Sequence, residues 1–381
     1  FGLRGSLELE RHLFREVGVR NGPTVVPLEL NAGLVDGLWT PRAAAAAGRL
    51  LQEMPSRDAA QICKALQVMP YSRSSLERVT GKLGTRWEEV REDAEAELID
   101  RFEVPEEAAA VTVSVDRVSL PMEEFLLDDA GQPVLDSTGR ERLRAAYRMA
   151  YCGVWTLHDA EGEPLHSVRY GRLPREGHGP IEEMLWTDLF ALKTKKPELK
   201  VVGLADGAPE MQLLLDRTAG LFDLSSTIGL DFWHVVEKLA AAIKATDRAS
   251  TDWMPKFKTF LRTDDRGAER VLMTLESWRV AYSDEVDPPE ALQAAITYVK
   301  GNVDRMRYKR LLDQGLPIGS GHVEATCKTL VSTRMKRCGA RWKPPGGQAI
   351  LSLRALAKSS RWDDAMGLLL PTWTVTVREV A

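Results

Sequence analysis

The segment VTVSVDRVSL, residues 111–120, indicates the fold class of this chain. Its polar and apolar residues alternate and it is rich in valine, a pattern that predicts a β-strand. Asp116 lies in the middle of this strand, flanked by apolar residues. Burying a carboxylate is unfavourable unless the group is paired or binds a cation. The segment therefore predicts both the first strand of a sheet and a position for chemistry.

The residues after this strand alternate between strand and helix patterns. A short apolar run at 199–204 is typical of a buried central strand. The order of hairpin-type strands followed by alternating helices and strands predicts an α/β domain, with a mixed sheet and helices packed on it. The other predicted elements are strands at 148–157, 165–171 and 227–230, helices at 181–192 and 209–219, and helices almost throughout 232–315.

The region before the sheet is predicted to be helical, apart from weakly patterned residues over 1–40. Residues 56–84 show two helices joined by a short turn, and Ser74 with Glu77 has the spacing of a capping box. This pattern is typical of a helix-turn-helix, although an ordinary helical hairpin fits the segment at least as well. The basic residues predicted on the outside of the second helix are Arg73, Arg78 and Lys82.

Charge is distributed unevenly along the chain. The net charge is only −4, yet residues 325–358 contain eight Lys and Arg and no Asp or Glu. An acidic helix is predicted over 86–101. A basic block of this kind is usually a solvated face, but the lack of compensating acids favours contact with a nucleic-acid backbone. The residues predicted to contact DNA there are Lys328, Arg334, Lys336, Arg337, Arg341 and Lys343.

Composition excludes several classes of protein. No run approaches the roughly 20 apolar residues of a membrane-spanning helix, which excludes a membrane protein. The four cysteines form no CxxC pair, which argues against a disulfide framework and a cysteine zinc site. A reducing, intracellular compartment is expected.

Two further acids occupy positions suited to chemistry. Asp206 directly follows the predicted strand at 199–204, at an edge where sheets place ligand groups. Glu324 lies in the first turn of a helix that follows a Gly-Ser-Gly segment. Each acid has a structural alternative: Asp116 could pair with Arg117, Asp206 could form an Asp-Gly turn, and Glu324 could serve the helix dipole. Jointly, the three carboxylates supply the oxygen ligands that a two-metal Mg²⁺ site needs.

A further pair lies in LDFWHVVEKL, residues 230–239. Asp231 and His234 are three residues apart at a strand-to-helix junction and would share a helix face. They are either an N-cap with a partly buried histidine or a pair that supports the acidic residues. The neighbouring Phe232, Trp233, Val235 and Val236 are predicted to be core.

These segments together resemble a known group of enzymes. The segment IGSGHVEATCKTLVSTRMKRCGARW, residues 318–342, is similar to the C-terminal signature of bacterial insertion-sequence transposases of the ISKra type. VSVDRVS, GLADGAPE and LDFWHVVEKL occur in the expected order upstream, and residues 347–366 resemble the tail that follows. The resemblance covers about residues 40–366.

The resemblance implies a DDE transposase with an RNase H-like core. Its acidic triad corresponds to Asp116, Asp206 and Glu324, which would hold two Mg²⁺ ions, with Mn²⁺ as a possible substitute. The Asp-x-x-His element shared with Mutator-like transposases corresponds to Asp231 and His234. Arg117 and His322 depart from the residues usual in the family, which leaves open a variant, inactive or domesticated copy.

The resemblance also implies an organisation and a cellular role. The expected parts are a helical N-terminal region over 1–104 with a helix-turn-helix at about 56–84, the RNase H-like core over 105–236, an all-α insertion over 237–315, the last part of the core with the basic block over 316–366, and a tail over 367–381.

The expected protein is a bacterial, cytoplasmic enzyme, nucleoid-associated when bound to DNA. It would cleave transposon ends at terminal inverted repeats and join them to target DNA as a homo-oligomer. The alternatives are an inactive or domesticated sequence-specific DNA-binding protein on the same fold and a metal-dependent DNA nuclease without joining activity.

Overall fold

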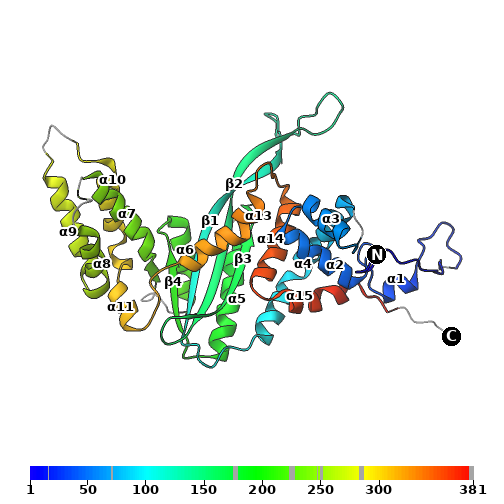
Figure 1. Ribbon diagram of the computed structural model, residues 1–381, viewed down its shortest axis with the longest axis horizontal. Helices are drawn as coiled ribbons and strands as arrows, with labels where there is room; N and C mark the ends of the chain where they lie inside the picture. Colours follow the sequence, from blue (N-terminus) through cyan, green and yellow to red (C-terminus); the bar gives the residue numbers. More distant parts are fainter. Residues whose placement is uncertain are drawn as a thin grey trace.

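A computed structural model of the chain describes residues 1–15, 17–69, 72–174, 179–222, 228–246, 248, 252–282 and 287–376. At its centre is a five-stranded mixed sheet with the strand order β3-β2-β1-β4-β5 (Figure 1). Strands β1 to β3 are antiparallel, and β4 and β5 continue the sheet in parallel with β1. This order, with helices on both faces, is the RNase H-like arrangement, so the predicted fold class is confirmed. The strands are β1 (Ala110–Phe125), β2 (Leu143–His158), β3 (Pro164–Arg172), β4 (Lys200–Ala205) and β5 (Ile228–Leu230).

The predicted strands agree with these elements to within a few residues at the sheet itself. Thr227, where the last strand was predicted to begin, lies outside the described residues.

The alternation of β1 decides which side chains face which helices. Val113 packs with α5 (Gly179–Lys195) and α6 (Pro209–Phe222), whereas Leu120 packs on the opposite face of the sheet. Since successive side chains of a strand point to opposite faces, Asp116 shares the face of Leu120.

The face of Leu120 is covered by a helical run over 321–335 and by α14 (Pro344–Lys358). The sequence predicted one helix from Gly321 to Arg337. The run is continuous but contains a π-helical segment, a feature that is often found at functional sites. The run consists of α12 (Gly321–Thr326), the π-helical η4 (Cys327–Ser332) and α13 (Thr333–Met335).

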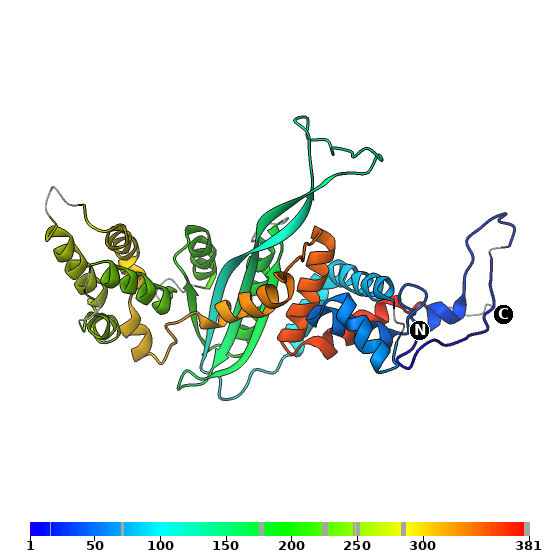
Figure 2. The same cartoon turned by 45° about the horizontal axis from the view of Figure 1, so that its top comes forward.

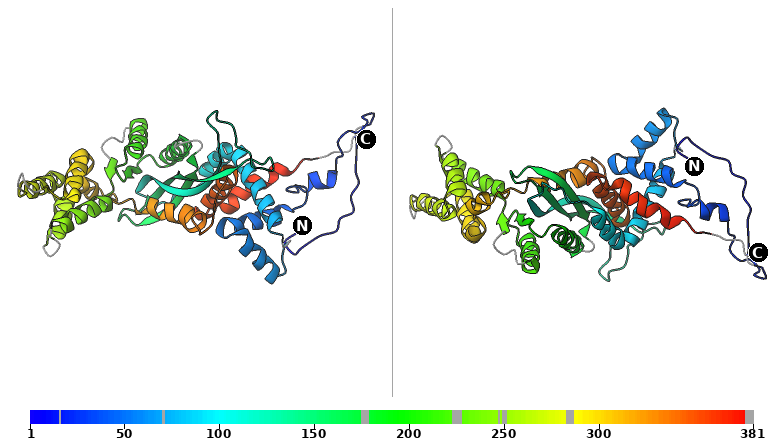
Figure 3. Two further views of the ribbon diagram at one scale, coloured as in Figure 1. Left: turned by 90° about the horizontal axis from the view of Figure 1, so that it is seen from above. Right: turned by 90° about the horizontal axis from the view of Figure 1, so that it is seen from below.

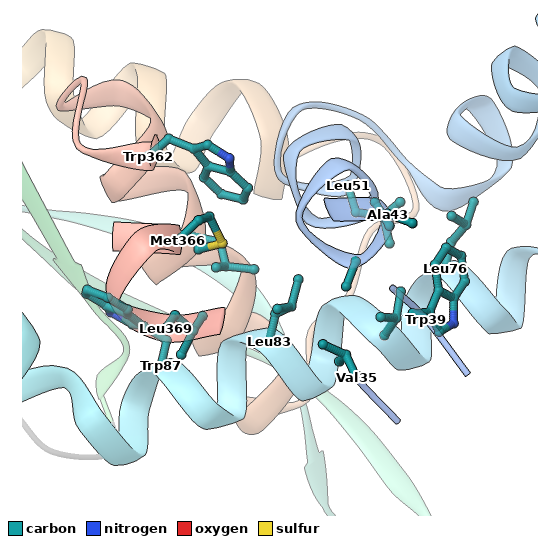
Figure 4. Close-up of a cluster of buried hydrophobic side chains, with 14 of the residues drawn as sticks. Val35, Trp39, Ala43, Leu51, Leu76, Leu83, Trp87, Trp362, Met366 and Leu369 are labelled. Atoms are coloured by element: carbon teal, nitrogen blue, oxygen red, sulfur yellow. The ribbon is translucent and has the colours of Figure 1, made fainter. Parts of the chain in front are cut away.

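The N-terminal helices and the last two helices of the chain share one hydrophobic cluster, which includes Trp39, Trp87 and Trp362 (Figure 4). Helix α14 has two buried faces, with Leu351 toward the sheet and Leu353 toward this cluster. The two termini therefore lie at the same end of the molecule (Figure 3). The elements are α1 (Pro27–Asn31), α2 (Pro41–Glu53), α3 (Ser56–Ala65), α4 (Arg73–Arg101), α15 (Trp362–Leu369) and the 3₁₀ helix η5 (Leu370–Trp373).

A second helical bundle lies at the opposite end of the molecule (Figure 1). It has its own hydrophobic cluster, to which Phe257, Leu275 and Val299 belong. Its elements are α7 (Phe232–Ala245), α8 (Trp253–Thr263), α9 (Gly267–Val280), α10 (Glu290–Asn302), the 3₁₀ helix η3 (Val303–Arg305) and α11 (Tyr308–Asp313). Within the described part of the chain, no helix combines the length and apolar character needed to cross a membrane.

Strands β1 and β2 continue past the sheet as a two-stranded arm. Pairing of β1 with β4 ends at Ser114 and pairing of β2 with β3 begins at Tyr151, whereas β1 and β2 stay paired as far as Phe125 and Leu143. Figure 2 shows the arm projecting from the body of the molecule. The loop predicted over 128–140 lies at its tip.

Helix α4 is one continuous helix where the sequence predicted two. It runs over 29 residues from Arg73, past the predicted end of the helix-turn-helix near residue 84. Glycine is unfavourable inside helices, yet Gly84 lies inside α4 and is buried. In the structure a Cβ on Gly84 would lie 2.2 Å from the Cβ of Ala349 in α14. The glycine therefore permits the close approach of α4 and α14.

We expect Gly84→Ala to lower the free energy of unfolding by about 2 kcal/mol, because the added methyl group forces the two helices apart. Gly81→Ala is the matched control, since nothing lies within 4 Å of a Cβ at Gly81. This control should raise the free energy of unfolding by about 0.5–1 kcal/mol. Urea unfolding measures both values, and equal effects would contradict a tight α4–α14 contact.

Two arginines of the basic block are buried at the C-terminal end of α2. Arg334 Nε donates to the carbonyl of Leu51 at 3.0 Å, and the Arg354 guanidinium donates to the carbonyl of Gln52 at 2.6 Å. The last carbonyls of a helix lack partners within the helix and carry the negative end of its dipole, so they attract cations. The sequence predicted Arg334 on an exposed basic surface; this is wrong, because its side chain is only 6% exposed.

Glu53, the last residue of α2, makes the stability of the protein depend on pH. Burial raises the pKa of Glu53, but hydrogen bonds from Lys358 and Arg354 outweigh this effect and lower the pKa to about 2. A folded pKa below the unfolded value of 4.5 means that the stabilisation is complete above pH 4.5 and is lost as the pH falls through 2. Because the Glu53 side chain is 38% exposed, solvent screening limits this stabilisation of the folded state to about 1 kcal/mol.

We therefore expect wild type to be about 1 kcal/mol more stable than Glu53→Gln at pH 7, and equally stable only below pH 2. Urea unfolding of both proteins across this range measures the difference. A difference that does not change with pH would show that the pairs with Arg354 and Lys358 contribute nothing.

Candidate active site

Asp116 lies within β1, just past the point where its pairing with β4 ends, and Asp206 directly follows β4. Strands β1 and β4 pair with Ser114 opposite Leu204, and each acid follows two residues later. Continued in the same register, the two acids are opposite one another, on the face of the sheet that α12 covers. The structure therefore brings these two predicted site residues together.

The local bonds of the two aspartates leave their charges without a basic partner. Arg117 donates only its backbone N–H to Asp116 Oδ1, at 2.6 Å, while its guanidinium pairs with Glu210 at 2.7 Å. Asp206 accepts a backbone bond from Ala208 at 2.9 Å and so also forms the expected turn. Among the described residues, neither aspartate has a Lys or Arg within ion-pair distance. Burial and the charge of Asp206 raise the pKa of Asp116.

Glu324 reaches this region from α12. Helix α12 packs on β1 and β2 through Val323, and Glu324 Oε1 lies 3.7 Å from Nδ1 of His234. Burial raises the pKa of Glu324, the His234 cation opposes this, and the charges of Asp231, Glu237 and Asp116 raise it further. The charge of Asp116 raises the pKa of Glu324, and the charge of Asp206 raises the pKa of Asp116. The three predicted acids are therefore close enough to interact electrostatically.

Asp231 and His234 connect α7 to the start of α12. Asp231 is fully buried; its Oδ1 accepts the backbone N–H of His234 at 2.7 Å and lies 3.2 Å from the ring Nδ1. Its Oδ2 accepts the backbone N–H of Ser320, the residue before α12. Asp231 is thus the N-cap of α7 and also holds the segment that carries Glu324.

The hydrogen bond with Asp231 raises the pKa of His234 to about 9. Burial raises the pKa of Asp231, but its hydrogen bonds to His234 and Ser320 outweigh this and lower it to about 2. His234 is therefore a cation at neutral pH, lying between Asp231 and Glu324.

Two sets of side chains could hold a metal ion. Ligand atoms of Asp231, His234 and Glu324 lie within 4.8 Å of one another. The first two of these are already bonded to each other, and a protonated imidazole cannot bind a metal. Asp116 and Asp206 instead offer hard oxygen donors without a basic partner, and Glu324 lies nearby. This donor chemistry fits Mg²⁺ or Mn²⁺.

The C-terminal basic block surrounds the turn between α13 and α14. Lys328 lies on η4, one turn after Glu324, and is exposed. Arg337 is exposed and lies 3.8 Å from Asp58. The other exposed cations of the block have no acidic partner at ion-pair distance among the described residues; they are Lys336, Arg341 and Lys343.

The basic residues of the predicted helix-turn-helix lie on the first three turns of α4. Arg73 pairs with Glu77 at 3.4 Å, and Arg78 pairs with Asp36 at 2.5 Å. Lys82 is exposed and has no ion pair within the described ranges. Because two of the three cations have acidic neighbours, binding DNA there requires an exchange of partners.

The chain was also compared with known proteins. No protein-family model matches it, and no curated protein matches it. The Drosophila P element transposase strand transfer complex is similar over 88% of this chain and 81% of that chain, with 13% identity and a TM-score of 0.31. The Mos1 transposase paired-end complex is similar over 72% and 79%, with 17% identity and a TM-score of 0.19. Identities and TM-scores this low transfer no function to this chain.

The structure adds neighbours that the sequence did not single out. The Cys327 thiol lies 3.5 Å from Asp116 Oδ2, and the Tyr298 hydroxyl donates to the carbonyl of Asp206 at 2.7 Å. Both come from elements distant in sequence, so no local spacing could have indicated them.

Trp233 differs from its prediction as a core residue. Its side chain is 53% exposed, and Lys258 Nζ lies 5.2 Å from its ring centroid. Adjacent residues on a helix point about 100° apart, so Phe232 is buried while Trp233 is not. An exposed aromatic ring therefore lies next to His234 and the acidic residues.

Proposed function

We propose that this chain is a DDE transposase of the ISKra type, which cleaves transposon ends and joins them to target DNA. The proposal is supported by Asp116 within β1 and Asp206 after the neighbouring β4 lying on the face of the sheet that carries Glu324 on α12. Burial and neighbouring acids raise the pKa of Asp116 and of Glu324, so their charged forms are unfavourable in the fold, and such a cost is typical of sites that act on a charged ligand. The resemblance of residues 318–342 to the transposase signature supports the same reading.

The residues of the site have separate tasks in this proposal. Asp116, Asp206 and Glu324 bind the metals, and the buried Asp231 holds α7 and the segment before α12 in place. His234 is the cation that orients Glu324. When bound, two Mg²⁺ or Mn²⁺ ions would activate water or a DNA 3′-hydroxyl and stabilise the leaving oxygen of an in-line displacement at phosphorus.

DNA is the proposed partner, bound through two basic regions. The exposed cations around the turn between α13 and α14 would contact backbone phosphates, which position DNA without reading its sequence. Arg73, Arg78 and Lys82 on α4 would contact the terminal inverted repeats. A homo-oligomer that pairs two transposon ends, in the bacterial cytoplasm, completes the proposal.

A strand-transfer assay tests this function. The substrate is a labelled duplex that carries the inverted repeats bracketing the coding sequence, incubated with a target plasmid in Mg²⁺, Mn²⁺ or EDTA. We expect a nick at the repeat end and a joined product, both dependent on the divalent ion. Cleavage without joining would identify a nuclease, and binding without cleavage would identify a DNA-binding protein; either result would overturn the proposal.

We expect the double variant Lys336→Ala/Lys343→Ala to bind duplex DNA less tightly and with a flatter salt dependence. Each phosphate contact releases condensed counterions, so the slope of log K against log [salt] should fall by about two units. The loss should be similar for cognate and random duplexes. Fluorescence anisotropy at several salt concentrations measures the slope, and an unchanged slope would show that these lysines are only solvated.

A further inference from the structure

A cavity of about 480 Å³ lies between the N-terminal helices and the turn after α13. Its walls come from the end of α2, the starts of α3 and α4, the turn over 336–342 and the first turns of α14. The volume is in the range of small-ligand sites, which span about 300–1,000 Å³. Residues from both predicted DNA-binding regions therefore line one space.

The cavity is strongly basic. Four arginines line it, against one acid, Glu77. The buried Arg334 is one of them; burial and the charges of Arg337 and Arg354 lower its pKa to about 10, so it stays a cation at neutral pH. Its guanidinium lies 5.0 Å from the centroid of Trp342, and Trp342 is held to Glu123 of β1 by a backbone bond of 2.9 Å. The basic lining is thus held in a fixed position.

Thr80 supplies an independent sign of a ligand. It lines the cavity from α4 and is only 1% exposed, yet its hydroxyl has no hydrogen-bond partner among the described residues. A buried polar group without a partner is unfavourable and rare in native structures. Its oxygen has almost no accessible surface, so a ligand oxygen would reach it only after a small shift of the cavity wall. Cations together with a hydroxyl donor are what phosphate oxygens require.

We infer that this cavity holds a backbone phosphate of DNA, together with its nucleotide, between α4 and the turn over 336–342. The inference rests on the proposed function, and adds a defined phosphate site away from the acidic residues. Arg334 is ten residues after Glu324 along the helical run, which corresponds to roughly 15 Å. At a rise of about 3.4 Å per nucleotide, the held phosphate lies about four nucleotides from the cleaved one.

Thr80→Val is the first test, because it removes the hydroxyl and keeps the shape. We expect duplex affinity to fall about tenfold while the thermal midpoint stays equal or rises, since a buried unpaired hydroxyl is removed from the free protein. Thr85→Val, on the same helix but outside the cavity, is the matched control and should change neither value. Unchanged affinity of Thr80→Val would overturn the inference.

Cys338 gives a second measurement, since it lines the cavity and is exposed, whereas Cys63, Cys152 and Cys327 are buried. Duplex DNA should protect Cys338 from maleimide labelling in wild type, and Arg341→Ala should need at least about tenfold more DNA for the same protection. Equal labelling with and without saturating DNA would overturn the inference. Protection by millimolar mononucleotide but not by duplex would assign the cavity to a free nucleotide and also overturn it.

A scan with single neutral methylphosphonates along the duplex tests the spacing. The largest loss of affinity should occur about four nucleotides from the cleavage position, and this peak should vanish in Arg341→Ala. A flat scan would overturn the inference. Cleavage of the same duplex is followed in parallel. Cleavage that persists with Cys338 unprotected would refute only the phosphate site, whereas protection without any cleavage would refute only the proposed function.

Discussion

We expect Asp116→Asn and Asp206→Asn each to reduce strand cleavage by at least about 1,000-fold, while duplex DNA binding stays within about twofold. Metal ligands act on the charge that develops in the transition state, whereas affinity for DNA comes mainly from Lys and Arg. The amide variants keep the shape of the side chain. They also keep an oxygen to accept the backbone bonds of Arg117 and Ala208. Loss of cleavage would therefore report the missing charge.

Stability should change in the opposite direction. The pKa of Asp116 is raised by burial and by the charge of Asp206, which means that the folded protein disfavours the charged carboxylate. Asp116→Asn should therefore raise the thermal midpoint slightly while cleavage is lost, as is common at functional sites. Asp304→Asn is the control, because Asp304 is an acid whose side chain is 99% exposed and should change neither property. Parallel loss of binding and cleavage would assign the aspartates to structure.

The sheet and its acids could be predicted because they depend on local patterns. Alternation placed β1 with Asp116 within it, and a short apolar run placed β4 with Asp206 directly after it. Asp206 was expected at the edge where sheets place ligand groups, and the resemblance joined it with Asp116 in one triad. Their partners could not be predicted, because Cys327 and Tyr298 reach the site only through tertiary packing.

Where the sequence misled, long-range contacts decided the structure. The predicted helix-turn-helix ended near residue 84, yet α4 continues past Gly84, which is needed where α4 approaches Ala349. Arg334 belongs to a run of charges that looked solvated, yet it caps α2, which lies far away in sequence. Trp233 had apolar neighbours and was predicted to be buried, yet it points outward beside His234. In the first two cases the deciding residue lies on another element, whereas Trp233 is exposed because of its position on its own helix.

We expect Asp231→Ala to lower the free energy of unfolding by about 3–4 kcal/mol, the second-largest effect after the loss of cleavage. Asp231 is fully buried and accepts bonds from the backbone of His234, its ring, and the backbone of Ser320. Alanine leaves these donors without an acceptor and leaves the His234 cation without its main partner. Urea unfolding of the purified variant measures the loss.

The same variant separates the two roles of Asp231. If Asp231 only caps α7, cleavage measured well below the unfolding temperature should be unchanged. If Asp231 also holds the segment that carries Glu324, cleavage should fall about 10- to 100-fold, because Glu324 would be displaced from its position in the site. We expect the fall. Ser72→Ala is the matched control, because Ser72 is the N-cap of α4 and accepts the backbone N–H of Ser75 at 3.4 Å. It should cost about 1 kcal/mol and leave cleavage intact. Full cleavage by folded Asp231→Ala would show that α12 keeps Glu324 in place without this bond to Ser320.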